Sequence, residues 1–375
     1  MAPTRPRPLR SPKQLLQDAI AKLEQGDALA AAALAKDALT ATGEDGDRAG
    51  AACALLGEIY VELGEIEKAR SFFLRAAEVD KEGTLPEELG GGPEKFLWLA
   101  QLSEDGGQDS VSWFERGTAA LRHQIQAATE ALAETRRKGG PKSVEEALGA
   151  REDEKKRKLA ETLCAVAEVY MTDLSWEADA EARCEALVTE ATMVAPELPD
   201  AWQTVANVRI SQTKVDEAKA ALERSLALWE DLPPEHPSVP AFATRVGLVR
   251  LLLEVEDEDK AIEVVERLLA EDDESVEAWY LGGLGLFTTG EKAKAKDVGD
   301  KWKSHWRAAR QSLNQCLRLF QLQEYEDDRL GDHAKELLES IAKELGPAPA
   351  DGEEDDDGWE DTDGDEDDED EDMED

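Results

Sequence analysis

The amino-acid sequence predicts an all-α fold, and three observations lead to this prediction. Ala, Glu, Leu and Lys dominate the 375 residues, whereas aromatic residues make up only 5%, which is typical of helical proteins. From Gln14 to Leu345 apolar side chains recur at helical spacing, and no strand-like alternation persists. Similar two-helix patterns also recur along the chain. These features predict stacked helical repeats, because one helix pair cannot bury its apolar face alone.

The clearest repeat spans residues 50–81 and is predicted to form two helices joined by a turn at Gly64. Small residues at fixed positions let the paired helices approach closely, and large residues fill the space between them. This spacing matches the tetratricopeptide-repeat (TPR) signature. Its marker residues are Leu56, Gly57 and Tyr60 in the first helix and Ala69, Phe73 and Ala76 in the second.

About seven such units lie between residues 14 and 345, some of them degenerate. Neighbouring units of this kind stack on one another, so the sequence predicts a TPR-type right-handed superhelical solenoid. The other units are marked by Ala31, Ala35 and Ala38; by residues 96–121; by residues 163–196; by Trp202, Val205, Ala206, Ala218 and Leu222; by Leu248, Val249, Leu252, Ala261, Val265 and Leu268; and by Trp279, Gly282, Gly283 and Leu286, followed by Gly290 and Ala295.

Four segments fall outside the repeat pattern. Residues 1–13 are rich in Pro and basic side chains and are predicted to be a disordered arm. Residues 122–158 read as a polar, partly helical insertion, and residues 302–345 as capping helices without the repeat signature. Residues 346–375 are predicted to be a disordered acidic tail, because the last 25 residues hold nineteen carboxylates and no Lys or Arg.

A search for catalytic chemistry gives no candidate, so we expect a binding protein and not an enzyme. The four His residues are isolated, the four Cys residues have no metal-ligand spacing, and no cofactor or metal site is expected. No apolar run is long enough to cross a membrane, and no secretion signal opens the chain, so we expect a soluble protein. The net charge of −43 disfavours direct binding of nucleic acids and favours a basic partner.

The predicted binding site is the concave face that the first helices of the repeats would line. Side chains one turn apart on these helices form a stripe of carboxylates with apolar and aromatic groups between them. Such a surface suits an extended basic protein segment with apolar anchors. The candidate residues of this groove are Glu58, Glu62, Glu161, Glu168, Asp200, Asn207, Glu254, Glu277, Tyr280 and Phe287.

One common TPR function can be tested on the same helices. TPR cochaperones that bind the acidic C-terminus of heat-shock chaperones use Lys, Asn and Arg on successive first helices. The chain has apolar and acidic residues at the corresponding positions, so an acidic peptide ligand is excluded. These positions hold Leu16, Ile20, Leu55, Glu58 and Glu62.

The whole layout resembles a family of fungal TPR proteins. TPR units over residues 14–345, a polar insertion after the third unit and an acidic C-terminus with a single Trp359 are similar to the dedicated assembly chaperones of large-subunit ribosomal protein four. The resemblance implies that the client is this ribosomal protein, whose long internal loop the solenoid captures. It also implies that the protein keeps the loop soluble from cytoplasm to nucleus and releases it at the pre-ribosome, with no small-molecule substrate.

Two other functions remain open from the residues alone. A TPR-type histone chaperone would also shield a basic client, although such proteins tend to place their acidic run within the repeats. A scaffold subunit of a multiprotein complex is the other alternative, although the strong charge argues against it. The basic arm and Lys155–Lys158 are candidate nuclear import signals, although i,i+4 pairing on a helix also explains the second.

Overall fold

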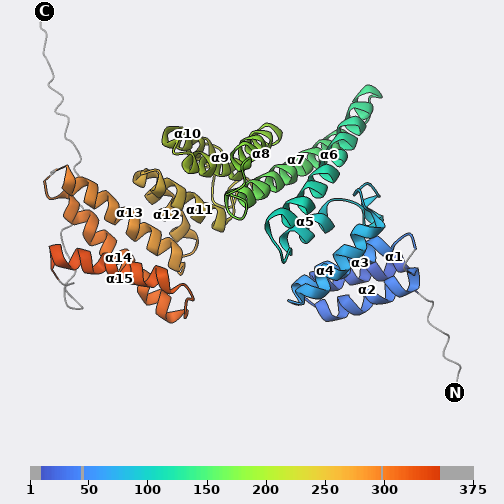
Figure 1. The fold of residues 1–375 in the computed structure, drawn as a ribbon, viewed down its shortest axis with the longest axis horizontal. Coiled ribbons are helices and arrows are strands. Elements are labelled where there is room, and N and C mark those ends of the chain that lie inside the picture. The colour runs from blue at the N-terminus through green and yellow to red at the C-terminus, as the bar shows by residue number, and fades with distance from the viewer. Residues whose placement is uncertain (1–9, 44–45, 297–298, 347–375) are drawn as a thin grey trace, which may run out of the picture. The chain divides into compact units, whose positions relative to one another are not determined.

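The computed structural model describes residues 10–43, 46–296 and 299–346, and these residues form an all-α TPR fold (Figure 1). They contain fifteen α-helices, one short 3₁₀ helix (η1) and no strand. The predicted fold class is therefore confirmed. The first helices in chain order are α1 (Pro12–Glu24), α2 (Ala28–Thr42), α3 (Ala49–Glu62), α4 (Ile66–Val79), η1 (Glu87–Leu89), α5 (Glu94–Gln101), α6 (Gly107–Arg137) and α7 (Lys142–Met171). They are followed by α8 (Ala180–Val194), α9 (Pro199–Ser211), α10 (Val215–Leu226), α11 (Phe242–Glu254), α12 (Glu258–Glu271), α13 (Val276–Ala295), α14 (Lys301–Leu322) and α15 (Asp328–Leu345).

The start of α1 shows how local sequence sets a helix boundary. Ser11 caps this helix: its hydroxyl accepts a hydrogen bond from the backbone N–H of Gln14, whose side chain accepts one from the backbone of Ser11. Pro12 occupies the first helical turn, where a missing N–H costs nothing. The helix thus includes the last two residues of the predicted basic arm, of which residues 1–9 lie outside the described residues.

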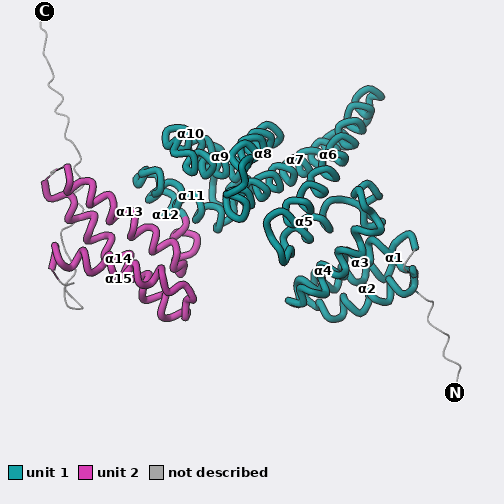
Figure 2. The backbone as a smooth tube through the Cα atoms, in the orientation of Figure 1, with its two compact units in different colours: residues 1–267 teal, residues 268–375 magenta. Residues whose placement is uncertain are grey.

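The chain divides into two compact units, residues 1–267 and residues 268–375 (Figure 2). In unit 1 each helix from α1 to α10 packs against the next one along the chain. The first two pairs share a core in which Leu56, Ile59 and Phe73 are fully buried. This is the nearest-neighbour packing that defines a repeat array.

The predicted insertion at residues 122–158 is not a separate segment. It forms the second half of α6 and the first half of α7, so both helices continue far beyond the repeat core. Near the core Leu121, Leu159 and Leu163 remain buried, whereas towards the connecting turn only isolated side chains such as Leu132 are buried. The polar composition reflects a solvated helical hairpin, and the prediction of partly helical structure underestimated its helix content.

Unit 2 contains α13, α14 and α15, and α13 departs from the predicted repeat. In a two-helix repeat, Gly290 and Ala295 would belong to a second helix after a turn. Instead, α13 continues as one helix from Val276 through Gly290 to Ala295. At Gly290 the absent side chain makes room for the buried indole of Trp306 on α14. The two helices α14 and α15 cover the region in which capping helices are predicted, and apart from Gly346 the predicted acidic tail lies outside the described residues.

Two further features concern membrane spans and the cysteine thiols. No helix in the described ranges is both long and apolar enough to cross a membrane. All four cysteines are buried and free of disulfide bonds. Burial raises the pKa of Cys164 and of Cys316 to about 11, so both are protonated at neutral pH.

Candidate functional site

The first helices of successive pairs line one face of unit 1, which we call the inner face. α1 contacts α3, α7 contacts α9, and α9 contacts α11. Lys158 on α7 pairs with Glu94 on α5 at 2.8 Å, and Thr244 on α11 donates a hydrogen bond to Asp200 on α9 at 3.1 Å. Polar contacts therefore link the helices along this face in chain order.

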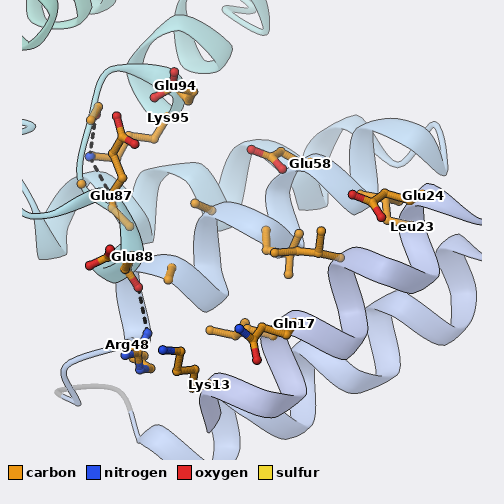
Figure 3. Close-up of a pocket in the computed structure, with 18 of the residues that line it drawn as sticks. Lys13, Gln17, Leu23, Glu24, Arg48, Glu58, Glu87, Glu88, Glu94 and Lys95 are labelled. Carbon is orange, nitrogen blue, oxygen red and sulfur yellow. Dashed lines mark hydrogen bonds between the residues drawn. The ribbon is translucent and has the colours of Figure 1, made fainter. Parts of the chain in front are cut away.

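At the N-terminal end of the inner face the helices enclose a hollow of about 560 Å³ (Figure 3). Its floor is apolar and is formed by one stripe of α1 and one stripe of α3. Its wall is formed by η1, the backbone of residues 90–92 and the start of α5, and Lys155 of α7 also lines it. The floor consists of Leu16, Ile20, Leu23, Ala51, Ala54 and Leu55.

The wall of this hollow is held in place by the buried side chain of Lys95. Its ammonium group pairs with the carboxylate of Asp80 at 2.8 Å and donates to the carbonyls of Gly90 and Gly92 at 3.2 and 2.9 Å. Burial lowers the pKa of Lys95, although the bond to Asp80 opposes this effect. Because an uncompensated buried charge is costly, this network fixes the glycine loop against α3.

Glu58 is the predicted groove residue that lies in this hollow. The side chain is half-buried, and its pKa is raised first by burial and then by repulsion from Glu94, while Lys158 opposes the shift. A carboxylate in this state is stabilised by any additional cation that approaches it. The hollow is therefore already biased towards a positively charged ligand.

A second acidic group lies further along the inner face, on α7 and α9. The side chains of Glu161 and Glu168 reach solvent, yet protein surrounds them closely enough that burial raises the pKa of both. Asp200 raises the pKa of Glu161 further, while Arg157 and Lys158 lower it. The structure thus places Glu161, Glu168 and Asp200 on the neighbouring helices α7 and α9, and no ion pair to any of them forms among the described residues.

The other predicted groove residues fall into two groups. Glu62, Asn207 and Glu254 are exposed side chains of unit 1, on α3, α9 and α11. Glu277 and Tyr280 are half-buried side chains of unit 2, where the Tyr280 hydroxyl lies 2.6 Å from Nδ1 of His333.

Phe287 was expected to offer its ring to a ligand, and this expectation is wrong. Its side chain is 7% exposed and stacks on Trp306 with the ring centroids 5.0 Å apart. The continuous helix α13 turns this position into the core of unit 2.

Sequence reasoning missed several residues of the hollow. Its apolar floor includes Leu16, Ile20 and Leu55, which were considered only as positions of an absent cochaperone clamp. The basic run Lys155–Lys158 forms ion pairs of two kinds. Lys156 pairs within α7, with Glu152 four residues earlier, whereas Lys155 pairs with Glu87 on η1. The available signal was the spacing of Leu16, Ile20 and Leu23 along one face of α1.

The described part of the chain offers no group of three or more His, Cys, Asp or Glu side chains that could hold a metal ion. What the inner face presents is a set of carboxylates beside an apolar hollow. This arrangement can bind a basic, partly apolar polypeptide through ion pairs and burial of apolar surface.

The fold and the carboxylates of the inner face define this chain as a TPR protein with an acidic inner face, and comparison with known proteins supports the repeat family. The profile of the tetratricopeptide-repeat family matches residues 50–82 and 246–312. A protein of Emericella nidulans described as a probable assembly chaperone of rpl4 is 44% identical over 345 residues, which are 89% of this chain and 82% of that protein. The protein of the same description from Schizosaccharomyces pombe is 31% identical over 78% of this chain and 80% of its own length.

A solved structure extends this relationship. The structure of residues 1–338 of an assembly chaperone of RpL4, Acl4, is 59% identical and matches with a TM-score of 0.72, covering 77% of this chain and 100% of that one. The chain belongs to the family of rpl4 assembly chaperones.

Proposed function

We propose that this protein is a dedicated chaperone of ribosomal protein L4, which it binds and shields for assembly into the large ribosomal subunit. The relatives are described as assembly chaperones of rpl4, and the acidic inner face suits a client that is basic. The protein works by binding alone, and it accompanies the client from the cytoplasm to the nucleus. The captured element is an extended internal loop of the client.

The single observation that carries this proposal is the line of carboxylates along the first helices of unit 1. Burial raises the pKa of Glu58, Glu161 and Glu168, and repulsion from Glu94 and from Asp200 raises those of Glu58 and Glu161 further, so these groups are held in an unfavourable state when they are charged. The positive charges of a basic client stabilise these carboxylates. The unfavourable free energy of the charged carboxylates in the unbound protein is thereby reduced, and this reduction contributes to the free energy of binding.

The same electrostatics provide a route for release. A ribosomal protein loop that lies among rRNA phosphates is basic, and it has no folded core of its own. Carboxylates of the inner face substitute for phosphates until the pre-ribosome offers more of them. Because exposed ion pairs contribute only about 0.2–1 kcal/mol each, the loop can leave them stepwise without nucleotide hydrolysis.

The test is a charge reversal at three exposed carboxylates of the inner face, Glu62→Lys, Glu161→Lys and Glu168→Lys in one full-length chain. We expect its affinity for a synthetic rpl4 internal loop to fall by roughly 10²–10⁴-fold in low salt, because repulsion replaces attraction at each position. Binding is measured by isothermal titration calorimetry after circular dichroism has shown that the helices are intact.

A matched control separates the face from the overall charge. Asp37, Glu78 and Glu263 are exposed carboxylates on the second helices α2, α4 and α12. Reversing these three changes the net charge by the same amount, and we expect less than about a tenfold loss of affinity, through weaker long-range steering only. Equal losses in the two triple variants would show that the inner face is not the binding site.

A further inference from the structure

We infer that the hollow formed by α1, α3 and α5 is the apolar anchor site for the client: it takes a bulky aliphatic or aromatic side chain of the client segment, with a Lys or Arg next to it. This inference rests on the proposed function, because it concerns the same client. It adds to that function a specific pocket and a sequence requirement that charge alone does not impose.

The floor of the hollow supports an apolar occupant. Leu16, Ile20 and Leu23 are spaced by four and three residues, so they form a continuous stripe along α1 beside Ala51, Ala54 and Leu55 of α3. Leu16 and Leu55 are almost fully buried, whereas Ile20 leaves 45% of its surface exposed. A hollow of about 560 Å³ lies in the size range, ~300–1,000 Å³, of pockets that bury most of a bound group.

The rim of the hollow determines where the positive charge of the client lies. α1 carries Lys13 at its first turn and Glu24 at its end, about 16 Å away by helix rise. α3 repeats this order, with Arg48 before its first residue and Glu58 near its end. In Figure 3 the labelled Glu24 and Glu58 accordingly lie at one side of the hollow, and Lys13 and Arg48 at the other.

The acidic side is the better cation site for two reasons. Among the described residues neither Glu24 nor Glu58 has an ion-pair partner in the structure. In addition, Glu24 is the last residue of α1, where the helix dipole adds negative potential.

Three of the four basic side chains that line the hollow are engaged elsewhere, and the fourth, Lys13, lies at the opposite end of α1 from Glu24. Lys95 is buried against Asp80, Lys155 pairs with Glu87, and Arg48 donates to the carbonyl of Glu88 at 3.0 Å. The occupant is therefore oriented, with its apolar side chain over Ile20 and its Lys or Arg towards Glu24 and Glu58.

The test uses two variants that change the hollow without removing a charge. Ile20→Ser removes the exposed part of the floor, and Ala54→Trp fills the hollow with an indole. We expect the first to weaken binding of the rpl4 internal loop roughly tenfold and the second by more than about tenfold. Because apolar contacts are not screened, the fold-change should be the same in 0.1 M and 0.5 M salt, unlike that of the charge reversal.

Leu29→Ser is the matched control, because Leu29 is an exposed aliphatic side chain on α2, with 74% of its surface accessible, outside the hollow. We expect this variant to bind like the wild type. If Ala54→Trp does not fold, the loop affinities of Ile20→Ser and Leu29→Ser are compared on their own, and this comparison is sufficient to test the anchor site.

The anchor site and the acidic face can fail independently in these measurements. If Ile20→Ser binds the loop as tightly as Leu29→Ser while the inner-face charge reversal still abolishes affinity, the anchor site is refuted and the acidic face stands. If neither set of variants changes the affinity, both the anchor site and the proposed binding face are refuted. A loss in Ile20→Ser that persists in 0.5 M salt supports the anchor site.

Discussion

At the scale of single residues, the repeat depends on how closely two helices can approach. Gly57 on α3 has no side chain, and the ring of Phe73 on α4 fills that space: a Cβ added at Gly57 would lie 2.6 Å from Cε1 of this ring. Phe73 is fully buried and stacks on Trp98, so it cannot move aside easily. The small residue of the repeat signature is thus required by its large partner.

We therefore expect Gly57→Ala to lower the free energy of unfolding by about 1–3 kcal/mol, and Gly57→Leu by more, because each overpacks a rigid interface. Gly247→Ala on α11 is the comparison, since nothing lies within 4 Å of its added Cβ. There the better helix propensity should stabilise the protein by up to about 1 kcal/mol. Urea denaturation followed by circular dichroism measures both, and equal effects would disprove the assigned close contact.

At the scale of helices, the sequence predicts what depends on local periodicity. The α3–α4 pair and its turn at Gly64 follow directly from the spacing of small and large residues, and Glu58 follows from its place one turn from the core positions. The α6–α7 hairpin was read as an insertion because a helix that protrudes into solvent loses its apolar stripe. A solvated helix and a polar loop then look alike in composition.

The parts of the site that could not be predicted depend on contacts between distant segments. Lys155 meets Glu87, and Lys158 meets Glu94, across more than 60 residues, and no spacing in the sequence encodes these pairs. Phe287 was misplaced for a related reason. Its outward or inward orientation depends on the partner helix α14, whose Trp306 occupies the space beside Gly290.

A prediction for α13 follows from this packing. In an exposed helix Gly→Ala stabilises by about 0.8–1 kcal/mol, but at Gly290 the new Cβ would lie 2.3 Å from Cδ1 of Trp306. The Trp306 indole is fixed by its hydrogen bond to the carbonyl of Phe287 at 3.0 Å. We expect Gly290→Ala to destabilise unit 2 by about 1–3 kcal/mol.

Thermal unfolding of the single and double variants with Trp306→Leu measures the interaction between the two positions. The smaller leucine makes room for the new methyl group, so Gly290→Ala should cost clearly less in the Trp306→Leu background than in the wild type. Gly149→Ala on α7, where nothing lies within 4 Å of the added Cβ, controls for the change in helix propensity. A turn at Gly290 would give the same effect in both backgrounds.

At the scale of the whole molecule, the proposed function implies that the acidic inner face lowers the stability of the empty protein and in return provides affinity for the client. The chain carries a net charge of −43, and charge of one sign destabilises a compact state through self-repulsion. The raised pKa values of Glu58, Glu161 and Glu168 locate part of this cost on the face that we propose to bind the client. A surface that were optimised for stability alone would place a basic partner beside each of these groups.

The pH dependence of stability tests this relationship in the variant Glu58→Gln, Glu161→Gln and Glu168→Gln. In the folded protein these carboxyls have a raised pKa, so the native state binds their protons more strongly than the unfolded chain does. Their contribution to stability is therefore fully present below the ordinary glutamate pKa of 4.5 and is lost as the pH rises through the raised values. The variant cannot lose it, so we expect it to melt at a higher temperature than the wild type at pH 7.

The advantage of the variant should disappear near pH 4, where the wild-type carboxyls are protonated as well. At pH 7 the same variant should bind the basic loop more weakly in low salt, because three attractive charges are absent. Differential scanning calorimetry from pH 4 to pH 8, with loop titrations at pH 7, measures both effects. Glutamine at the control positions 37, 78 and 263 should change neither the melting temperature nor its pH dependence by a comparable amount. A variant that gained no stability at pH 7 would show that the inner face carries no electrostatic strain, and loop affinity would then have to arise from the apolar hollow.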